Sequence, residues 1–429
     1  MRQLAYATLC LLGMAASAEA ASLELHRGIG IQDWLNWAPI NTDANGNFTT
    51  YRWPPYRSND EWLSAYRPLS DWPAGDQFVR IKSMGFDFVR LAVDPGPLLA
   101  STGVGRQQAL AVLETAVKHV TLSGLKVVFD LHSVEQVPYY GRQFMDAPPG
   151  SQFIAEYRAM VRDVATMLAT KVGVGKVALE PFNEPAHYGT CFGGSTDWQQ
   201  IMVATVVDIR TISPDLTIIA TGACGGSIDG LIALDPTGAD ENILFSFHMY
   251  EPHVFTHQRP DPDIGTTFSS GLPWPVTPQF GKADWVYWMK QNMTWAGLSQ
   301  AEQQMNLDKQ DATVTEYFNQ GWGQTQLAAR FKQATDWAAA NGIPNKRLFM
   351  GEFGAILTPP WLDMGAYEED RSAYIRAVRL LAQTNGIPWS AWEYTNPLGM
   401  SLIVPRWDPA AVSAPAVPDD NLLAALGLR

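Results

Sequence analysis

The chain contains 429 residues, of which 46% are hydrophobic and 17% are charged. This composition supplies enough apolar material for a sizeable core and excludes an intrinsically disordered chain. The formal net charge of −13 excludes the basic footprint that nucleic-acid binding requires, and it would repel anionic lipids and strongly anionic polymers. By length the chain could form two domains, but α/β barrels run large as one domain.

The amino-terminal segment predicts a signal peptide. Arg2 precedes an apolar run centred on residues 9–12, and residues 18–20 (Ala-Glu-Ala) offer the small-x-small pattern after which signal peptidases cut. That run is too short to span a bilayer, and no later stretch approaches the ~20 apolar residues of a membrane helix. We therefore expect residues 1–20 to be removed and residues 21–429 to be secreted or periplasmic. An uncleaved anchor is the alternative.

Three cysteines are present, and the first, Cys10, leaves with the expected signal peptide. In an oxidising compartment the remaining pair, Cys191 and Cys224, is expected to form a disulfide. Closing that loop would stabilise the folded chain by roughly 3–4 kcal/mol, because the unfolded chain loses entropy. Two unrelated free thiols are the alternative.

Short apolar runs rich in β-forming residues alternate with segments of helical periodicity, which is typical of βα units around a parallel sheet. Runs such as residues 127–129 (Val-Val-Phe) are continuously apolar, as expected of strands buried on both faces. Helical periodicity covers residues 106–122, 151–170, 197–211, 324–341 and 369–383, and residues 421–427 could form a short closing helix. Eight strands are predicted, at residues 28–31, 86–93, 126–131, 176–182, 216–220, 243–247, 347–351 and 388–392. They indicate a single-domain α/β fold, a closed (β/α)8 TIM barrel.

Two connections, residues 32–72 and 251–322, are far longer than usual βα loops and follow predicted strands 1 and 6. Such loops are usually functional, and in a barrel they would rise from the active-site face. Sugar rings stack on flat aromatic surfaces, so we expect two or three of the rings, Trp34 among them, to face an extended carbohydrate. The alternative is that the rings form small cores of the loops themselves. The rings are Trp34, Trp37, Tyr51, Trp53, Tyr56, Trp62, Tyr66 and Trp72, then Trp274, Trp285, Tyr287, Trp288, Trp295 and Trp322.

Two glutamates emerge directly from predicted strands. Glu184 lies within residues 180–185 (Glu-Pro-Phe-Asn-Glu-Pro) after strand 4, and Glu352 lies within residues 351–354 (Gly-Glu-Phe-Gly) after strand 7. A carboxylate there costs desolvation free energy unless it is used or paired, and barrel active sites lie at the carboxyl ends of strands. Glycoside cleavage needs one carboxylic acid and one carboxylate on opposite sides of the anomeric carbon. The pair therefore indicates this chemistry, although a lone glutamate would more often be a salt-bridge partner.

Other strand ends carry side chains that suit roles beside these glutamates. A guanidinium near Glu352 would hold it ionised as a nucleophile, and an amide could bind a sugar 2-hydroxyl. Imidazole or phenol groups fix the orientation of carboxylates and tune their protonation, and an indole could form the floor of the sugar subsite. Each histidine alone would more often be a structural side chain. The residues in these roles are Arg90, Asn183, His132, His248, Tyr250 and Trp392.

Six strand-end segments occur in order: Val89-Arg90-Leu91, Asp130-Leu131-His132, Asn183-Glu184-Pro185, His248-Met249-Tyr250, Gly351-Glu352-Phe353-Gly354 and Trp392. Together they resemble glycoside hydrolase family 5, the cellulase-type members of clan A, over nearly the whole mature chain. The resemblance implies a retaining mechanism with Glu184 as acid/base and Glu352 as nucleophile. It also implies a −1 subsite lined by Arg90, His132, Asn183, His248, Tyr250 and Trp392.

Three segments depart from the family's pattern. Residues 27–31 lack the asparagine motif that usually follows Arg-Gly at strand 1, Ala186 separates Asn-Glu-Pro from His187, and residues 133–136 differ from the usual cellulase form. None touches the two carboxylates, but all bear on substrate subsites and leave the polymer open. In this frame Cys191 follows strand 4 and Cys224 follows strand 5, so a disulfide would pin the loop beside Glu184.

We therefore expect a retaining, endo-acting β-glycanase, foremost an endo-β-1,4-glucanase, that acts as a monomer on neutral or weakly charged β-linked polysaccharide or oligosaccharide. No cofactor, metal, nucleic acid or membrane span is expected. The alternatives are a β-mannanase, β-1,3-glucanase or exopolysaccharide hydrolase of the same family, and a non-catalytic carbohydrate-binding barrel. A zinc hydrolase using His248, His253 and His257 is disfavoured, because the spacing matches no zinc motif and Pro252 would break a helix presenting them.

Overall fold

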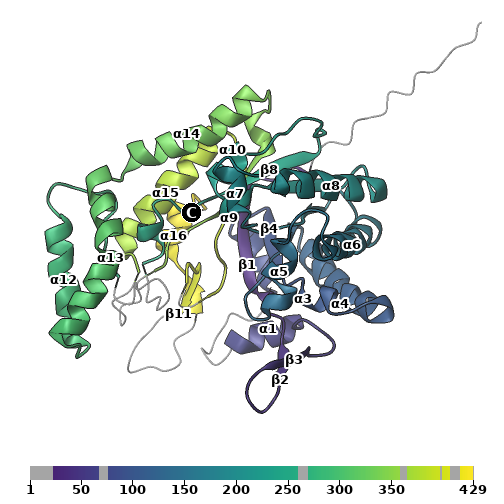
Figure 1. Cartoon of the computed structure of the whole chain (residues 1–429), viewed down its shortest axis with the longest axis horizontal. Coiled ribbons are helices and arrows are strands. Elements are labelled where there is room, and N and C mark those ends of the chain that lie inside the picture. The colour runs from purple at the N-terminus through teal and green to yellow at the C-terminus, as the bar shows by residue number, and fades with distance from the viewer. Residues whose placement is uncertain are drawn as a thin grey trace, which may run out of the picture.

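A computed structural model describes residues 23–66, 76–258, 269–357, 365–396, 399–405 and 416–428. Eight parallel strands close a barrel in the order β1-β10-β9-β8-β7-β6-β5-β4, with helices around it (Figure 1). This confirms the predicted (β/α)8 fold, whereas the expected signal peptide, residues 1–20, lies outside the described residues. The barrel strands are β1 (Arg27–Leu35), β4 (Phe88–Val93), β5 (Lys126–Leu131), β6 (Val177–Glu180), β7 (Thr217–Thr221), β8 (Ile243–Met249), β9 (Leu348–Phe353) and β10 (Trp389–Ala391).

Long helices follow five of the strands, at the predicted positions, and pack on the outside of the barrel. They are α4 (Gly103–Leu122), α6 (Gln152–Met167), α8 (Asp197–Ile212), α14 (Gln324–Ala340) and α15 (Glu368–Thr384), and the predicted closing helix is α16 (Asp420–Ala425). None of the described helices combines the length and apolar character that crossing a bilayer requires. The shorter helices are α2 (Gln77–Ser83), α3 (Gly96–Leu99), α5 (Arg142–Met145), α7 (Tyr188–Cys191), α9 (Ala223–Gly226) and α10 (Ile228–Ile232).

The amino-terminal end of the barrel is closed by the segment that precedes β1. Leu23 and Leu25 are 7% and 6% exposed, and the backbone N–H of Leu23 donates to Thr217 Oγ1 at 2.8 Å. Their side chains pack on residues from the beginnings of the strands, so the barrel interior is a filled core at this end. This core cluster consists of Leu23, Leu25, Phe88, Val128, Ala178, Ile219, Leu244 and Phe349.

The two long connections contain regular elements where the sequence indicated loops. The first holds an antiparallel hairpin, β2 (Ile40–Thr42) and β3 (Phe48–Tyr51), and then α1 (Asn59–Tyr66). The second holds α11 (His253–Thr256) and two long helices, α12 (Lys282–Trp295) and α13 (Gln300–Gln320), which pack together at the left of Figure 1. A helix-start signal was present at α13, where Ser299 and Glu302 form a reciprocal capping box. A small antiparallel pair, β11 (Ile403–Pro405) and β12 (Ala416–Pro418), precedes α16.

Candidate active site

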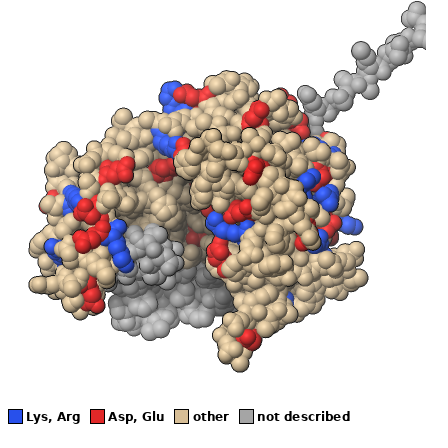
Figure 2. Space-filling view, viewed as in Figure 1, with Lys and Arg blue, Asp and Glu red and all other residues tan. Residues whose placement is uncertain are grey.

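A cleft of about 690 Å³ opens at the carboxyl ends of the barrel strands. Because the strands are parallel, the side chains that follow them meet at this end. The viewed face in Figure 2 carries scattered acidic and basic side chains and no extended basic patch. Of the predicted site residues, Glu184, Glu352, His132, Tyr250 and Trp392 line the cleft.

Glu352 is 3% exposed near the end of β9, and each of its oxygens accepts a hydrogen bond. Arg90 Nη1 donates to Oε1 at 2.5 Å, and the Tyr250 hydroxyl donates to Oε2 at 2.8 Å. Burial raises the pKa of Glu352, but the positive charges of His248 and Arg90 outweigh burial and bring the pKa down to about 2. Glu352 is therefore ionised at neutral pH, as a carboxylate nucleophile must be.

Arg90 is fully buried on β4, and several acceptors share its guanidinium. Nε donates to Glu180 Oε2 at 2.7 Å, while Nη2 donates to Asn183 Oδ1 at 2.8 Å and lies 3.1 Å from Asp130 Oδ2. Burial lowers the pKa of Arg90, but the carboxylates of Asp130 and Glu180 outweigh burial and raise the pKa well above its usual range. Asp130 and Glu180 occupy paired positions on β5 and β6 and were not predicted as site residues. In the sequence, the signal that could have identified Asp130 and Glu180 was an acidic side chain near the end of an otherwise apolar strand segment.

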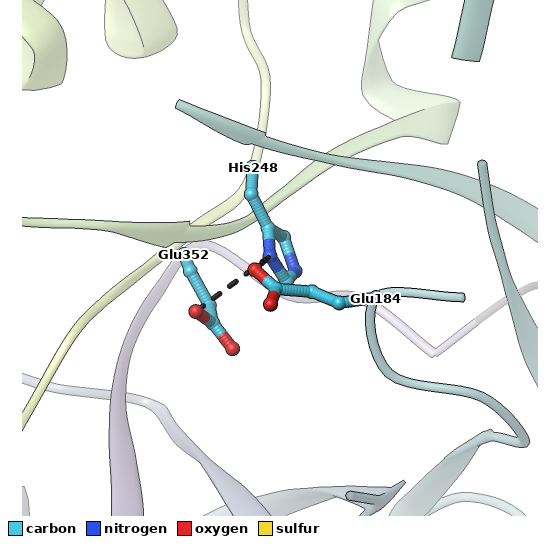
Figure 3. Close-up of side chains that lie close together, drawn as sticks. All are labelled: Glu184, His248 and Glu352. Atoms are coloured by element: carbon cyan, nitrogen blue, oxygen red, sulfur yellow. Dashed lines mark hydrogen bonds and ion pairs between the residues drawn. The ribbon is translucent and has the colours of Figure 1, made fainter. Parts of the chain in front are cut away.

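Glu184 lies opposite this buried network and is more accessible, with 30% of its side chain exposed. Its Oε1 lies 2.8 Å from Nδ1 of His248, which sits beside Glu352 in the register of β8 and β9 (Figure 3). Burial lowers the pKa of His248, but the carboxylates of Glu352 and Glu184 outweigh burial and raise the pKa. One oxygen of each glutamate and one nitrogen of His248 lie within 4.8 Å of one another. Retaining glycosidases place their two carboxyl groups ~5–5.5 Å apart, and inverting enzymes place them ~6.5–9.5 Å apart.

The other predicted residues form a wall beside Arg90. Asn183 Nδ2 lies 3.2 Å from His132 Nε2, and His132 Nδ1 lies 2.8 Å from Asp130 Oδ2. The His132 ring stacks on Trp392 with centroids 5.5 Å apart and planes inclined by 7°. The structure thus brings together all six residues that were predicted to surround the two glutamates.

A family model described as cellulase (glycosyl hydrolase family 5) matches residues 42–397 of the chain. The chain belongs to glycosyl hydrolase family 5. The match begins after β1, at the end of β2, and runs to the segment after β10, so it includes the other seven barrel strands and both glutamates.

Relatives of this family 5 chain are similar to it over parts of their length. Endoglucanase 3 of Fibrobacter succinogenes is 28% identical over 205 residues, which cover 46% of this chain and 27% of that protein. Cellodextrinase A of Ruminococcus flavefaciens is 25% identical over 236 residues, or 54% of this chain and 60% of that protein. This chain therefore spans less than two thirds of either relative. The structure of endoglucanase Cel5A from Thermotoga maritima aligns over 94% of this chain and 98% of that one, with a TM-score of 0.61 and 20% identity, and shares the fold.

The prediction that Trp34 faces a ligand is wrong. Its side chain is 2% exposed and stacks on Trp62 with ring centroids 5.4 Å apart. Its indole N–H donates to the carbonyl of Arg57 at 3.0 Å, and the ring belongs to the main hydrophobic core of the protein. Trp37, three residues further on, is 41% exposed and lines the cleft instead. The composition of the connection indicated aromatic contact but could not say which ring turns outward.

The cleft of this family 5 barrel also contains polar residues that the sequence did not single out. Gln32 and Asp33 come from the end of β1, and Glu393 directly follows Trp392. With its amide oriented to satisfy its neighbours, Gln32 donates to Glu393 Oε2 at 2.7 Å and accepts from Trp37 Nε1 at 3.3 Å. Burial and the nearby Asp33 carboxylate raise the pKa of Glu393 well above its usual range. A protonated Glu393 offers the cleft a hydrogen-bond donor as well as an acceptor.

Cys191 and Cys224 form the expected disulfide, with an S–S distance of 1.95 Å, and join α7 to α9. Beside the bridge, the backbone N–H groups of Cys224 and the next residue donate to the carbonyls of Ala186 and Pro185 at 2.9 and 3.0 Å. Since Pro185 directly follows Glu184, the loop after β7 is fastened to the segment that presents this glutamate.

The charge of the site disfavours a catalytic metal. Three carboxylate and imidazole groups lie close enough to share an ion, but the Arg90 guanidinium, 2.5 Å from one of them, already supplies a fixed positive charge. Two of the three groups, His248 and Glu184, also form a hydrogen bond with each other. In the part of the chain that the structure describes, neither His253 nor His257 joins this cluster, as a zinc site built on these histidines would require. The cluster consists of Glu184, His248 and Glu352.

Proposed function

We propose that this chain is a retaining, endo-acting β-glycanase, foremost an endo-β-1,4-glucanase. The observation that carries the proposal is the pairing of two unlike carboxyl groups in one cleft. Glu352 is buried and held as a carboxylate by Arg90 and Tyr250, whereas Glu184 is 30% exposed and lies within reach of a leaving group. Their oxygens lie within 4.8 Å of each other, which supports double displacement rather than inversion.

In the proposed first step, an oxygen of Glu352 attacks the anomeric carbon while the bond to the leaving sugar oxygen breaks. Glu184 donates its proton to that oxygen, so the departing chain leaves as an alcohol and a glycosyl ester forms on Glu352. The donors Arg90 and Tyr250 hold the attacking carboxylate in a single orientation. Asn183 would bind the sugar 2-hydroxyl, a contact that strengthens in the transition state.

In the second step, Glu184, now a carboxylate, removes a proton from water as the water oxygen attacks the anomeric carbon. The ester bond breaks, Glu352 returns to a carboxylate and Glu184 regains its proton. His248, bonded to Glu184 Oε1, keeps this carboxyl group aimed at the same position in both steps. Two displacements on opposite faces retain the configuration.

The proposed substrate is a neutral β-linked polymer. The net charge of −13 disfavours polyanions, and the indoles of Trp37 and Trp392 offer flat surfaces for sugar rings. The two relatives are named an endoglucanase and a cellodextrinase, and Cel5A of Thermotoga maritima has been crystallised with cellobiose and with mannotriose. The mannotriose complex makes β-mannan the second candidate.

We also propose that residues 1–20 direct export and are removed, and that the mature enzyme acts outside the cytoplasm as a monomer without a cofactor. The disulfide supports this location, because such bonds persist in oxidising compartments. Mass spectrometry of the natively exported protein should find a new amino terminus near Ala21, and size-exclusion chromatography with light scattering should give the mass of one chain.

A substrate panel tests the activity. Reducing sugars and viscosity are measured on carboxymethyl cellulose, mannan, laminarin and xylan, with Glu352→Gln as the matched control. We expect the fastest release from the cellulose derivative, an early fall in viscosity, and a loss of at least ~10³-fold in the variant. Hydrolysis of mannan alone would favour the second candidate. Equal activity of wild type and Glu352→Gln would overturn the assignment of the nucleophile.

A further inference from the structure

Helix α12 exposes three of its four aromatic side chains and buries both of its methionines. Tyr287, Trp288 and Trp295 are 57%, 49% and 69% exposed, whereas Met289 and Met293 are 2% and 0% exposed. A core-facing helix normally turns its largest apolar side chains inward. Three large rings on the outer side therefore need a reason other than the stability of the helix.

The exposed rings share one side of α12. Seven residues make two helical turns, so Trp288 and Trp295 lie nearly in line, about 10.5 Å apart along the axis. Gln291, which is partly exposed, lies one turn from each of them, and Tyr287 packs edge-on against Trp288 with ring centroids 5.4 Å apart. We call this surface the α12 aromatic face and define it as Tyr287, Trp288, Gln291 and Trp295.

The helix that carries this face is firmly held. On its inner side Trp285 is 1% exposed and donates its indole N–H to the carbonyl of Ser270 at 3.0 Å. Lys282, at the start of the helix, pairs with Asp311 of α13 at 2.6 Å. Figure 1 places α12 at the outer edge of the molecule, with α13 on its inner side. A long ligand can therefore reach the face without entering the cleft.

We propose that the α12 aromatic face is a second, non-catalytic binding site for the polysaccharide that the cleft hydrolyses. This inference rests on the proposed function. Sugar rings stack their C–H faces on indoles, and a side-chain amide between two indoles can bond the hydroxyls at the ring edges. The axial spacing of Trp288 and Trp295 is close to the length of one disaccharide unit in an extended β-1,4-linked chain. The face would hold insoluble polymer beside the enzyme while the cleft acts on it.

Two other occupants fit the observations less well. A membrane-surface helix carries basic residues beside its apolar face, but α12 and α13 together carry three lysines and five acidic residues. A protein partner that forms a stable interface covers about 20–30 residues on each side. The exposed large apolar residues of α12 are three, Tyr287, Trp288 and Trp295, which is far fewer.

The test separates binding to solid polymer from turnover of soluble substrate. The double variant Trp288→Ala/Trp295→Ala is compared with wild type in two measurements. The first is the fraction of protein that insoluble cellulose removes from solution, and the second is kcat/KM on a soluble cello-oligosaccharide. We expect adsorption to weaken about tenfold, because two stacking contacts are lost, and kcat/KM to stay unchanged. Leu122→Ala is the control for the loss of exposed apolar surface. This leucine is 87% exposed at the end of α4, so both measurements should equal those of wild type.

Equal adsorption of the double variant and wild type would overturn the second site. A parallel fall in kcat/KM would also overturn it, since the residues would then support the fold or the cleft. Adsorption to anionic vesicles that disappears in the double variant, with cellulose adsorption intact, would assign the face to membranes instead. If wild type hydrolyses no glycan but adsorbs to cellulose through these tryptophans, the proposed function fails while the binding site stands.

Discussion

At the scale of single residues, one guanidinium sets the charge of the site. Arg90 contacts Glu352, Glu180 and Asp130 while fully buried, so loss of any partner would leave an uncompensated charge in a dry environment. Removal of one member of a buried ion pair commonly costs ~3–5 kcal/mol. Substitution of Arg90 itself would therefore confuse folding with catalysis, and the second donor to Glu352 is the better residue to test.

Tyr250→Phe removes the hydroxyl that donates to Glu352 Oε2 and keeps the ring. We expect kcat to fall by about 10²-fold, because loss of one preorganised donor costs this much in comparable sites. The pKa of Glu352 should rise with the loss of this hydrogen bond, so the acidic limb of the profile of kcat/KM against pH should move to higher pH. Steady-state kinetics between pH 2 and 8 measure both effects. An unchanged kcat would remove Tyr250 from the mechanism.

The depressed pKa of Glu352 also predicts a trend in stability. The folded-state pKa of about 2 lies below the ordinary value of 4.5, so ionised Glu352 stabilises the fold above pH 4.5. This contribution is lost as pH falls from 4.5 towards 2. Glu352→Gln lacks the titration, so wild type should lose stability relative to this variant between pH 5 and 3. Urea unfolding midpoints measure the difference, and parallel curves for the two proteins would count against the assigned charge.

At the scale of elements, the disulfide lies among unusual backbone conformations. Glu184, His187 and Cys224 have φ angles of +44°, +29° and +58°, which residues other than glycine adopt at a cost of ~1–3 kcal/mol each. The bridge between α7 and α9 spans the loops that contain them. We therefore expect the disulfide to act as a positioning device for the acid/base.

Cys191→Ser/Cys224→Ser tests this expectation. For cello-oligosaccharides, whose leaving group needs a proton, kcat/KM should fall about tenfold or more as Glu184 loses its position. For a dinitrophenyl β-cellobioside, whose leaving group needs no proton, kcat/KM should change by less than about twofold. Reduction of the wild type should reproduce the pattern, with thermal unfolding recorded in parallel. Equal losses on both substrates would point to general destabilisation instead.

The segment before β1 acts as a plug for the barrel. Leu25 is 6% exposed within the cluster at the amino-terminal end of the strands. Leu25→Ala should lower the free energy of unfolding by ~2–5 kcal/mol, because the substitution leaves a cavity in a packed core. The site lies at the opposite end of the barrel from the cleft, so kcat/KM at 25 °C should remain as in wild type. Urea denaturation measures the free energy of unfolding, and a cellobioside assay on the same preparation measures kcat/KM. A variant as stable as wild type would contradict the role of Leu25 in closing the barrel.

The sequence predicted the barrel well and its insertions poorly. Strands such as β5 are continuous apolar runs bounded by turns, so their position follows from local pattern alone. Because the strands were predicted at the right positions, the residues at their ends, including Glu184 and Glu352, were predicted at the right positions as well. Helix α12 mixes Trp, Tyr and Met with polar residues around its circumference, so its sequence lacks the clear apolar stripe that predicts a helix. The direction of the Trp34 side chain depends on the end of β1, where the register with β4 shifts between Ile31 and Leu35, and this irregular pairing is a tertiary property.

At the scale of the whole molecule, the protein supplies its own cation beside Glu352, the guanidinium of Arg90. Dialysis against EDTA should therefore leave kcat and the melting temperature unchanged, because Arg90 occupies the position from which a metal would neutralise Glu352. Loss of activity that Zn²⁺ or another divalent ion restores would show that the cluster of Glu184, His248 and Glu352 binds a metal after all.

In the proposed mechanism, the closed barrel, its plugged amino-terminal end and the cleft at the carboxyl end place the carboxylate of Glu352 beneath an anomeric carbon. The direct test of that claim is to trap the glycosyl-enzyme. Incubation with an activated 2-deoxy-2-fluoro-β-cellobioside, followed by peptide mass spectrometry, should find one sugar adduct, on Glu352. An adduct on Glu184 or on another residue, or hydrolysis with inversion and no adduct, would contradict the account.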